Sequence, residues 1–212
     1  MIAWIPARGG SVRLPRKALA DLGGKPVLAW TIEAAQAARR FSAVVVSSDD
    51  AEIRDVATAY GAEAHVRPPS LATDTITLAE VLGALAPVGP LAILLPTSPF
   101  RTPETIRRAV ETFQRQTCAQ LLSITPYVHP PQWALLRHGQ TVVPAYPALF
   151  VAPRQRLTPA WQHDGSYWIV GGPGSEILAF ETPLDEVCDI NTPQDLDYAR
   201  WMLSQRPLAA AI

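Results

Sequence analysis

Five short apolar segments that alternate with helical patterns predict a three-layer α/β sandwich with a mostly parallel sheet. The predicted strands are 2–5, 43–47, 62–66, 91–95 and 120–124. Each is a short apolar or β-branched run, as expected of a strand that is buried on both faces of a parallel sheet. Because a helix is predicted between each pair of successive strands, the chain up to residue 124 is expected to form consecutive βαβ units.

Five helices are predicted, and each begins beside a residue that favours a helix N-terminus. Their ranges are 26–39, 51–59, 75–86, 103–116 and 193–203. The starting signals are Pro26, Asp50, Thr102 before Pro103, and Thr192 before Pro193, with Thr73, Asp74 or Thr75 for the helix at 75–86. Asp195 lies three residues after Thr192, which is the spacing of a capping box and supports the last helix.

The region 126–165 interrupts this alternation. Proline, of which the chain has 21, clusters there, so the region is expected to be irregular or extended. A strand resumes at 166–170. We therefore expect a single domain, 1–212, with an insertion at about 126–165 that forms an arm against a second subunit. Packing of its aromatic side chains inside the monomer is the alternative.

The composition excludes several classes of protein. The chain of 212 residues carries 18 Lys and Arg against 19 Asp and Glu, so no nucleic-acid or membrane partner is expected. No segment is long enough to span a membrane, and the start does not resemble a signal peptide. Cys118 and Cys188 match no metal or redox spacing, so we expect reduced cysteines and a cytoplasmic location.

The opening stretch, residues 2–17, contains the first candidate binding loop. The predicted strand ends at Pro6, and a loop with adjacent glycines, Gly9 and Gly10, follows. Its cations are Arg8, Arg13, Arg16 and Lys17. Glycines let backbone N–H groups approach a ligand and cations neutralise phosphate oxygens, so the loop suits phosphate. Its spacing is that of neither a Walker loop nor a G-x-G-x-x-G motif, and on spacing alone a solvated surface loop is equally compatible.

The positions of four loops strengthen this interpretation. The loops at 6–17, 47–50, 67–75 and 96–102 each follow a predicted strand. In parallel sheets, ligands bind beyond the carboxyl ends of the strands. We therefore expect these loops to gather on one rim of the sheet and to form the binding site together.

Four segments of the chain, in their order and spacing, carry a resemblance to a known family. They are IPARGGSVRLPRK at 5–17, VVVSSDDAEI at 44–53 with VRPPSLATDT at 66–75, LLPTSPFRT at 94–102, and CDINTPQDLDYA at 188–199. A weaker fifth match is PRQRLTP…DGSYWI within 153–169. Together they resemble the signatures of the acylneuraminate cytidylyltransferase family, the CMP-N-acetylneuraminic acid synthetases and their relatives.

The resemblance implies a nucleotide-diphospho-sugar transferase-like (Rossmann-like) fold and a reaction. CTP and a 2-keto-3-deoxy sugar acid of eight or nine carbons, such as sialic, legionaminic or pseudaminic acid, would give a CMP-sugar and pyrophosphate. The sugar hydroxyl would attack the α-phosphate while a divalent metal, Mg²⁺ or Mn²⁺, stabilises the charge. We also expect a homodimer built through the insertion at about 126–165.

The resemblance further implies roles for individual residues. The catalytic group would be Arg8, Arg13, Lys17 and Asp189. The nucleotide would contact Ala7, Arg8, Gly9, Gly10, Ser11, Lys17, Arg67, Asp74 and Thr77. The sugar acid would contact Thr97, Ser98, Arg101, Arg154, Gln155 and Tyr167. Asp189 and Asn191 would bind the metal, although Asp189 could instead only tie down its loop, and Asp74 could be only a helix cap.

Four departures from the family pattern put parts of this assignment in doubt. Asn191 stands where the family has a second aspartate, and Val12 where it has a lysine that Arg13 could replace. Ala18 stands for an asparagine and Leu95 for a glutamine that faces the sugar. A catalytically impaired nucleotide- or sugar-binding homologue is therefore the alternative function. GTP or UTP in place of CTP also remains open.

Overall fold

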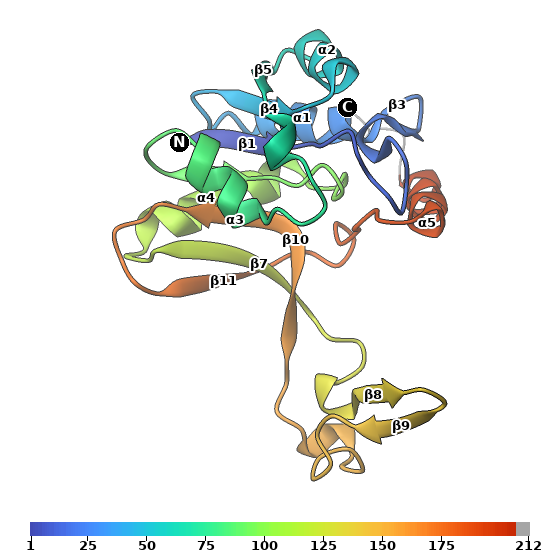
Figure 1. The fold of residues 1–212 in the computed structure, drawn as a ribbon. Helices are drawn as coiled ribbons and strands as arrows, with labels where there is room; N and C mark the ends of the chain where they lie inside the picture. The colour runs from blue at the N-terminus through green and yellow to red at the C-terminus, as the bar shows by residue number, and fades with distance from the viewer. Residues whose placement is uncertain (207–212) are drawn as a thin grey trace.

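The computed structural model describes residues 1–206 and contains a seven-stranded sheet with helices packed against it (Figure 1). The strand order is β11-β7-β10-β6-β1-β4-β5. The strands are β1 (Ile2–Pro6), β4 (Val44–Ser48), β5 (Glu63–Val66), β6 (Leu91–Ile93), β7 (Gln120–Pro126), β10 (Trp161–Val170) and β11 (Ile177–Glu181). Of the six neighbouring pairs in this sheet, only the two that involve β10 are antiparallel. The predicted α/β fold with a mostly parallel sheet is confirmed.

Five α-helices lie in the described part of the chain. They are α1 (Val27–Ala38), α2 (Ala51–Ala59), α3 (Leu78–Leu85), α4 (Pro103–Arg115) and α5 (Pro193–Ser204). The side chains of Asp50, Thr102 and Thr192 cap α2, α4 and α5, as predicted. The predicted start of α3 was wrong, because Thr77 caps it in a capping box with Glu80. None of these helices is long and apolar enough to cross a membrane.

Several short strands were not predicted. Two form a small antiparallel sheet of β2 (Asp21–Leu22) and β3 (Lys25–Pro26). Two more form a hairpin of β8 (Leu135–His138) and β9 (Thr141–Pro144), and β11 pairs in parallel with β7 at the edge of the main sheet. Strands of two residues show no periodicity, and all four residues of β8 are exposed, so no apolar alternation marks these segments.

Two apolar cores position the loops that matter for function. The larger core packs α1 and α4 against the sheet through fully buried residues such as Leu28, Ile32 and Ile106. Truncating such a side chain to alanine typically costs about 2 to 5 kcal/mol. The smaller core joins α5 to the β2–β3 sheet, and it buries Ile190 and Leu196. This smaller core holds the segment before α5 in place.

A long arm, residues 127–160, projects from the body of the molecule (Figure 1). Its stalk is formed by the ends of β7 and β10, and the β8–β9 hairpin lies near its tip. The arm lies within the insertion predicted at 126–165, but the residues from Trp161 onward belong to the regular strand β10. β10 is therefore longer than the predicted strand at 166–170.

The stalk meets the sheet at an irregularity in β10. The pairing of β10 with β7 changes register between His163 and Trp168. The Asp164 carboxylate accepts hydrogen bonds from the Ser123 hydroxyl and the Ser166 N–H, at 2.5 and 2.8 Å. Gly165, between them, has a φ of +76°, which favours glycine. The extra residues of β10 are thus accommodated in a hydrogen-bonded bulge.

Candidate active site

A cavity of about 550 Å³ lies beyond the carboxyl ends of β1 and β6. Its wall is formed by the loop after β1, the segment 67–78 after β5, the residues 95–97 after β6, and two residues before α5. The loop at 47–50 supports this wall from behind. The prediction that these loops gather on one rim of the sheet is therefore confirmed, as expected for parallel strands.

The support from loop 47–50 involves the first glycine of the opening loop. The Gly9 N–H donates to the Asp49 carboxylate at 3.0 Å. A Cβ on Gly9 would lie 2.8 Å from the Cβ of Asp50, which leaves no room for a side chain. Gly10 has open space around its α-carbon. Neither glycine is in the cavity wall, and the Gly9 N–H is already used, so the predicted backbone cradle is not formed by Gly9.

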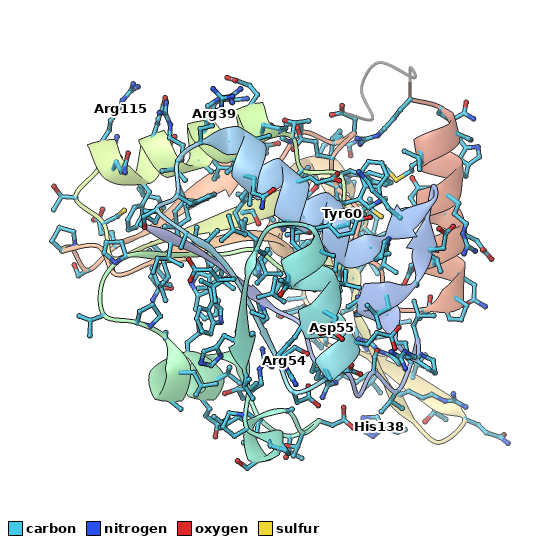
Figure 2. All side chains as sticks on the ribbon, turned by 90° about the horizontal axis from the view of Figure 1, so that it is seen from above. Arg39, Arg54, Asp55, Tyr60, Arg115 and His138 are labelled. Atoms are coloured by element: carbon cyan, nitrogen blue, oxygen red, sulfur yellow. The ribbon has the colours of Figure 1, made fainter. Side chains whose placement is uncertain are left out.

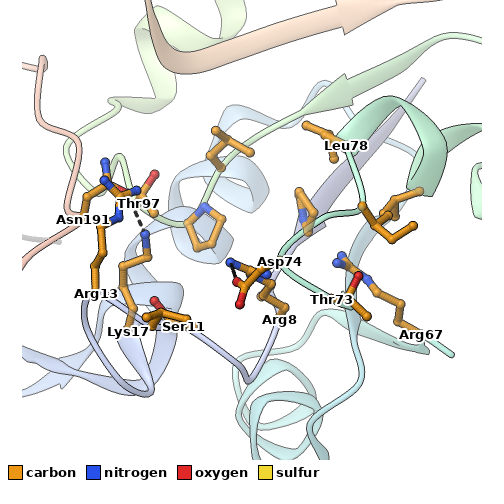
Figure 3. A pocket seen from close by; sticks show the side chains of 18 of the residues that line it. Arg8, Ser11, Arg13, Lys17, Arg67, Thr73, Asp74, Leu78, Thr97 and Asn191 are labelled. Carbon is orange, nitrogen blue, oxygen red and sulfur yellow. Dashed lines mark hydrogen bonds and ion pairs between the residues drawn. The ribbon is translucent and has the colours of Figure 1, made fainter. Parts of the chain in front are cut away.

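One end of the cavity holds an exposed ion pair and a buried guanidinium (Figure 3). Arg8 and Asp74 form a salt bridge at 2.6 Å that joins the opening loop to the 67–78 segment. Both side chains are partly exposed, so the pair contributes at most about 1 kcal/mol and Arg8 is readily available to a phosphate. Arg67 is only 4% exposed and donates to the Ser47 carbonyl at 2.9 Å. Burial lowers the pKa of Arg67, and Asp49 opposes that shift.

The other end of the cavity holds a hydrogen-bonded network centred on Asn191 (Figure 3). The Asn191 side-chain oxygen accepts hydrogen bonds from Lys17 Nζ at 3.0 Å and Arg13 Nη2 at 3.1 Å. Its Nδ2 donates to Asp189 at 2.6 Å. Burial lowers the pKa of the Lys17 amino group, while Asp189 opposes the shift. The network therefore gathers two cations and one carboxylate around the partly buried Asn191, with Lys17 partly buried and Arg13 and Asp189 exposed.

The segment that carries Asp189 and Asn191 is fixed from both sides. The Ile190 N–H donates to the Thr97 carbonyl at 2.8 Å, and the Ile190 side chain is fully buried in the smaller core. The Asn191 N–H donates to Asp195 in the first turn of α5. These bonds place the carboxylate and the amide beside Lys17, although they are more than 170 residues apart in sequence.

The structure brings about half of the predicted site residues into one cavity. Those in its wall are Ala7, Arg8, Ser11, Arg13, Lys17, Arg67, Asp74, Thr97, Asp189 and Asn191. Thr77 does not line the cavity because its side chain caps α3. Arg154 and Gln155 lie in the arm, where Arg154 donates to the Val128 carbonyl at 3.0 Å.

Three predicted sugar-binding residues are buried outside the cavity wall. Ser98 is fully buried and Tyr167 is 1% exposed, with its hydroxyl 3.5 Å from Glu186. Arg101 is 3% exposed, and its guanidinium donates to the carbonyls of Leu95 and Ser166. The side chains of Arg101 and Tyr167 are occupied by internal contacts, and the buried Ser98 hydroxyl has no hydrogen-bond partner but does not line the cavity. The geometry therefore does not support a direct sugar contact by any of the three.

An apolar part of the cavity wall was not predicted. It consists of Val27, Leu71, Ile76, Leu78, Val81 and Leu95. Only Leu95 was singled out from the sequence, as a departure from the family pattern. The capping box of Thr77 and Glu80 was the signal that could have found Ile76, Leu78 and Val81, because it ends the loop at residue 76 and starts α3 at Leu78. No such signal marks Val27 or Leu71.

The donor set at Asp189 fits a divalent metal only in part. Among residues 1–206 no three His, Cys, Asp or Glu side chains converge as a metal site. A single carboxylate such as Asp189 suits Mg²⁺ when phosphate oxygens of a nucleotide complete the coordination. Asn191 fits less well, because its oxygen already accepts hydrogen bonds from Lys17 and Arg13.

Comparison with known proteins identifies the family. A family model described as cytidylyltransferase matches residues 2–134, which is more than half of the chain. The chain belongs to the cytidylyltransferase family. It is accordingly a CTP-dependent nucleotidyltransferase.

Relatives within this family act on acidic sugars. The pseudaminic acid cytidylyltransferase of Campylobacter jejuni is 32% identical over 92% of this chain and 93% of its own. The CMP-N,N'-diacetyllegionaminic acid synthase of Legionella pneumophila is 42% identical over 63% of this chain and 61% of its own. A solved structure of CMP:2-keto-3-deoxy-manno-octonic acid synthetase complexed with CTP superimposes with a TM-score of 0.71, covering 96% of this chain and 98% of that chain. At 19% identity this last likeness concerns the cytidylyltransferase fold alone.

Proposed function

We propose that this cytidylyltransferase transfers CMP from CTP to a nine-carbon 2-keto-3-deoxy sugar acid of the pseudaminic or legionaminic type and releases pyrophosphate. The observation that carries the proposal is the charge of the cavity. Four cationic side chains, Arg8, Arg13, Lys17 and Arg67, line it against two carboxylates, Asp74 and Asp189. Such a lining suits a triphosphate and a carboxylate-bearing sugar, and two relatives carry these sugar acids in their names.

The reaction needs positioning and charge stabilisation more than covalent help from the protein. The sugar hydroxyl forms a new bond to the α-phosphorus as the bond to the bridging oxygen of pyrophosphate breaks, and the hydroxyl proton is released. Lys17, Arg13 and Arg8 line the cavity and would neutralise the triphosphate and the leaving pyrophosphate. Ala7, Ser11 and Arg67 would hold the nucleoside, and Thr97 and Leu95 would face the sugar.

A divalent metal, Mg²⁺ or Mn²⁺, is part of the proposal. It would be held by Asp189 together with phosphate oxygens, and when bound it would supply charge neutralisation at the triphosphate. Lys17 and Arg13 already provide positive charge beside Asp189 through Asn191. We therefore propose that this protein depends on these two cations in addition to the metal.

A homodimer built through the arm is also proposed. The hairpin exposes large apolar side chains on both strands: Leu135, Leu136, Val142 and Val143 are 44% to 55% exposed. An isolated two-stranded hairpin is marginally stable, and an exposed apolar patch is typical of an interface. The arm projects from the body of the chain (Figure 1), and Arg154 and Gln155 do not line the cavity of the same chain, so we propose that they reach a sugar in a neighbouring subunit.

The dimer proposal has a direct test. Leu136 and Val143 are paired across the hairpin, so the double variant Leu136→Asp/Val143→Asp places two charges on one face. We expect this variant to sediment as a monomer at concentrations where the wild type is a dimer, with CTP binding retained. His138→Asp, on the same hairpin (Figure 2), is the matched control and should not change the sedimentation. A wild type that is monomeric throughout would refute the proposal.

We also place the protein in the cytoplasm. Both cysteines, Cys118 and Cys188, are free and buried, which is compatible with a reducing compartment. Fractionation of cells that produce the protein, with a periplasmic marker as reference, tests this placement.

The activity is tested by pyrophosphate release with Mg²⁺. CTP is combined with pseudaminic, legionaminic, N-acetylneuraminic and 3-deoxy-octulosonic acids, with GTP and UTP as alternative nucleotides. We expect release with CTP and a pseudaminic- or legionaminic-type acid, and loss of release in Lys17→Ala but not in Arg115→Gln. Arg115 is suited to be the control, because it points away from the body at the end of α4 (Figure 2). CTP binding without release would favour the impaired binding homologue, and absence of nucleotide binding would refute both readings.

A further inference from the structure

A second cavity, of about 450 Å³, lies apart from the proposed active site. It is bounded by β3 and α1, by the segment 99–103 before and at the start of α4, and by Arg206 after α5. The two cavities share no lining residue. The chain passes between them, since Thr97 lines the first and Pro99 the second. A volume of this size suits a small organic molecule.

The lining of the second cavity carries a positive charge. Its cations are Lys25, Arg101 and Arg206, whereas Glu33 is its one acidic side chain. Lys25 forms a salt bridge with Glu33 and lies 3.8 Å from the centre of the Trp30 ring. The Arg206 guanidinium lies 4.1 Å from the centre of the Phe100 ring, which holds it over the cavity wall. With Lys25 and Glu33 neutralising each other, Arg101 and Arg206 leave an excess of positive charge.

Arg101 is the unusual member of this lining. It is 3% exposed, and its terminal nitrogens donate to Thr31 Oγ1 and to the carbonyls of Leu95 and Ser166. All three acceptors are neutral. No carboxylate within residues 1–206 forms a salt bridge with it, and its Nε has no hydrogen-bond partner.

A buried cation without a counter-ion is energetically unfavourable. Burial lowers the pKa of Arg101 to about 10, which agrees with incomplete charge compensation. Tyr167, Asp164 and Glu186 oppose this lowering of the pKa, but Glu186 accepts hydrogen bonds from Thr102 and Thr105 at the start of α4 rather than from Arg101. An anion in the cavity would supply the missing counter-charge.

We propose that the second cavity is a binding site for a small organic anion that carries two or more negative charges on phosphate or carboxylate groups. Arg206 and Lys25 would contact the anion from the cavity wall, and Lys25 would leave its salt bridge with Glu33 to do so. The buried Arg101 would attract the anion by its charge. The ring faces of Trp30 and Phe100 are covered by the cations, so the charged groups rather than an aromatic ring determine what binds.

The test uses the full-length protein and calorimetric titration. The probes are glycerol 3-phosphate for the phosphate class and succinate for the carboxylate class, each titrated into protein that is saturated with CTP so that the first cavity is filled. The variant is Lys25→Gln/Arg206→Gln, which leaves the buried Arg101 and hence the fold intact. Arg115→Gln removes a cation of the same kind from the far end of α4 and serves as the matched control.

We expect at least one probe to bind the wild type and Arg115→Gln equally, and to bind the double variant at least tenfold more weakly, with unchanged affinity for CTP. The probe that binds identifies the class of anion. Binding of neither probe would overturn the proposal, as would equal binding by the double variant or a parallel loss of CTP affinity. The titration does not require turnover, and it can be repeated without CTP, so failure of the proposed CMP transfer leaves its outcome interpretable.

Discussion

The substitution Asn191→Asp tests the proposed metal site, because it puts a carboxylate where an amide now lies between one carboxylate and two cations. Asn191 Nδ2 is 2.6 Å from Asp189, while its oxygen is 3.0 Å from Lys17 and 3.1 Å from Arg13. Aspartate at this position would bring two carboxylates together. A divalent cation between them relieves their repulsion, so we expect tighter binding of the metal.

The size of the effect follows from the charges that surround the new carboxylate. Two unit charges about 4 Å apart interact by about 4 kcal/mol at an effective dielectric constant of about 20, and a dication doubles this attraction. Lys17 and Arg13 offset most of the gain because they contact the same side chain. We therefore expect a net gain of about 1.4 to 2.8 kcal/mol, which is a ten- to hundredfold lower dissociation constant.

Binding of Mn²⁺, followed by the electron paramagnetic resonance signal of the free ion, measures this constant without turnover. Titrations are made with CTP present. Thr73→Asp is the matched control, because it adds one carboxylate to the opposite end of the same cavity. If Asn191→Asp binds Mn²⁺ no more tightly than the wild type, or if Thr73→Asp has the same effect, the assignment of the metal to Asp189 is refuted.

Three further predictions concern individual side chains. Burial lowers the pKa of Lys17 below 10.5, so its charge is lost at a lower pH than in free lysine. The affinity for CTP should therefore fall as the pH rises toward 10.5. In a fluorescence titration, Lys17→Arg should flatten this dependence because arginine stays charged. Leu95→Gln replaces an apolar wall with a hydrogen-bonding group, and the ratio of kcat/KM between N-acetylneuraminic and pseudaminic acids should change at least tenfold; an unchanged ratio would remove Leu95 from the sugar site. Arg101→Gln should lower the free energy of unfolding by about 3 kcal/mol or more in urea denaturation, because it leaves buried carbonyls without a hydrogen-bond donor. Arg115→Gln should change the free energy of unfolding by no more than about 0.5 kcal/mol.

The sequence was sufficient to predict those parts of the fold and the site that depend on local signals and on strand direction. Asp50 caps α2, and Thr192 with Asp195 caps α5, because capping depends on residues a few positions apart. The convergence of Arg8, Lys17 and Asp189 followed from strand direction and from the ordered motifs. The start of α3 was wrong because several candidate caps lie close together, and only the position of Glu80 selects Thr77.

The sequence was not sufficient to predict the direction of a side chain that is set by hydrogen bonds to distant backbone groups. Arg101 follows the end of β6 in a motif that suggests the site, yet it turns inward to the carbonyl of Ser166, which lies in the bulge of β10. The Ser166 carbonyl is free to accept from Arg101 because the bulge interrupts the pairing of β10 with β7. The sequence of this segment predicts only a strand and gives no sign of the bulge. Tyr167 also faces inward: its side chain is buried in the larger core, and its N–H donates to the Ser123 hydroxyl beside the bulge.

The bulge in β10 also makes the strand register of the arm independent of the register in the main sheet. On the sheet side, Trp168 to Val170 pair with Leu122 to Gln120, and on the arm side, Trp161 to His163 pair with Pro126 to Ile124. The two ladders keep independent registers, so residues could be added to or removed from the stalk in matched pairs without shifting the strands that support the active site. Each added pair would move the hairpin outward by about 3.4 Å, the rise of one antiparallel residue. The reach of the arm can thus vary in this fold while the strands that carry the cavity of the same chain keep their register.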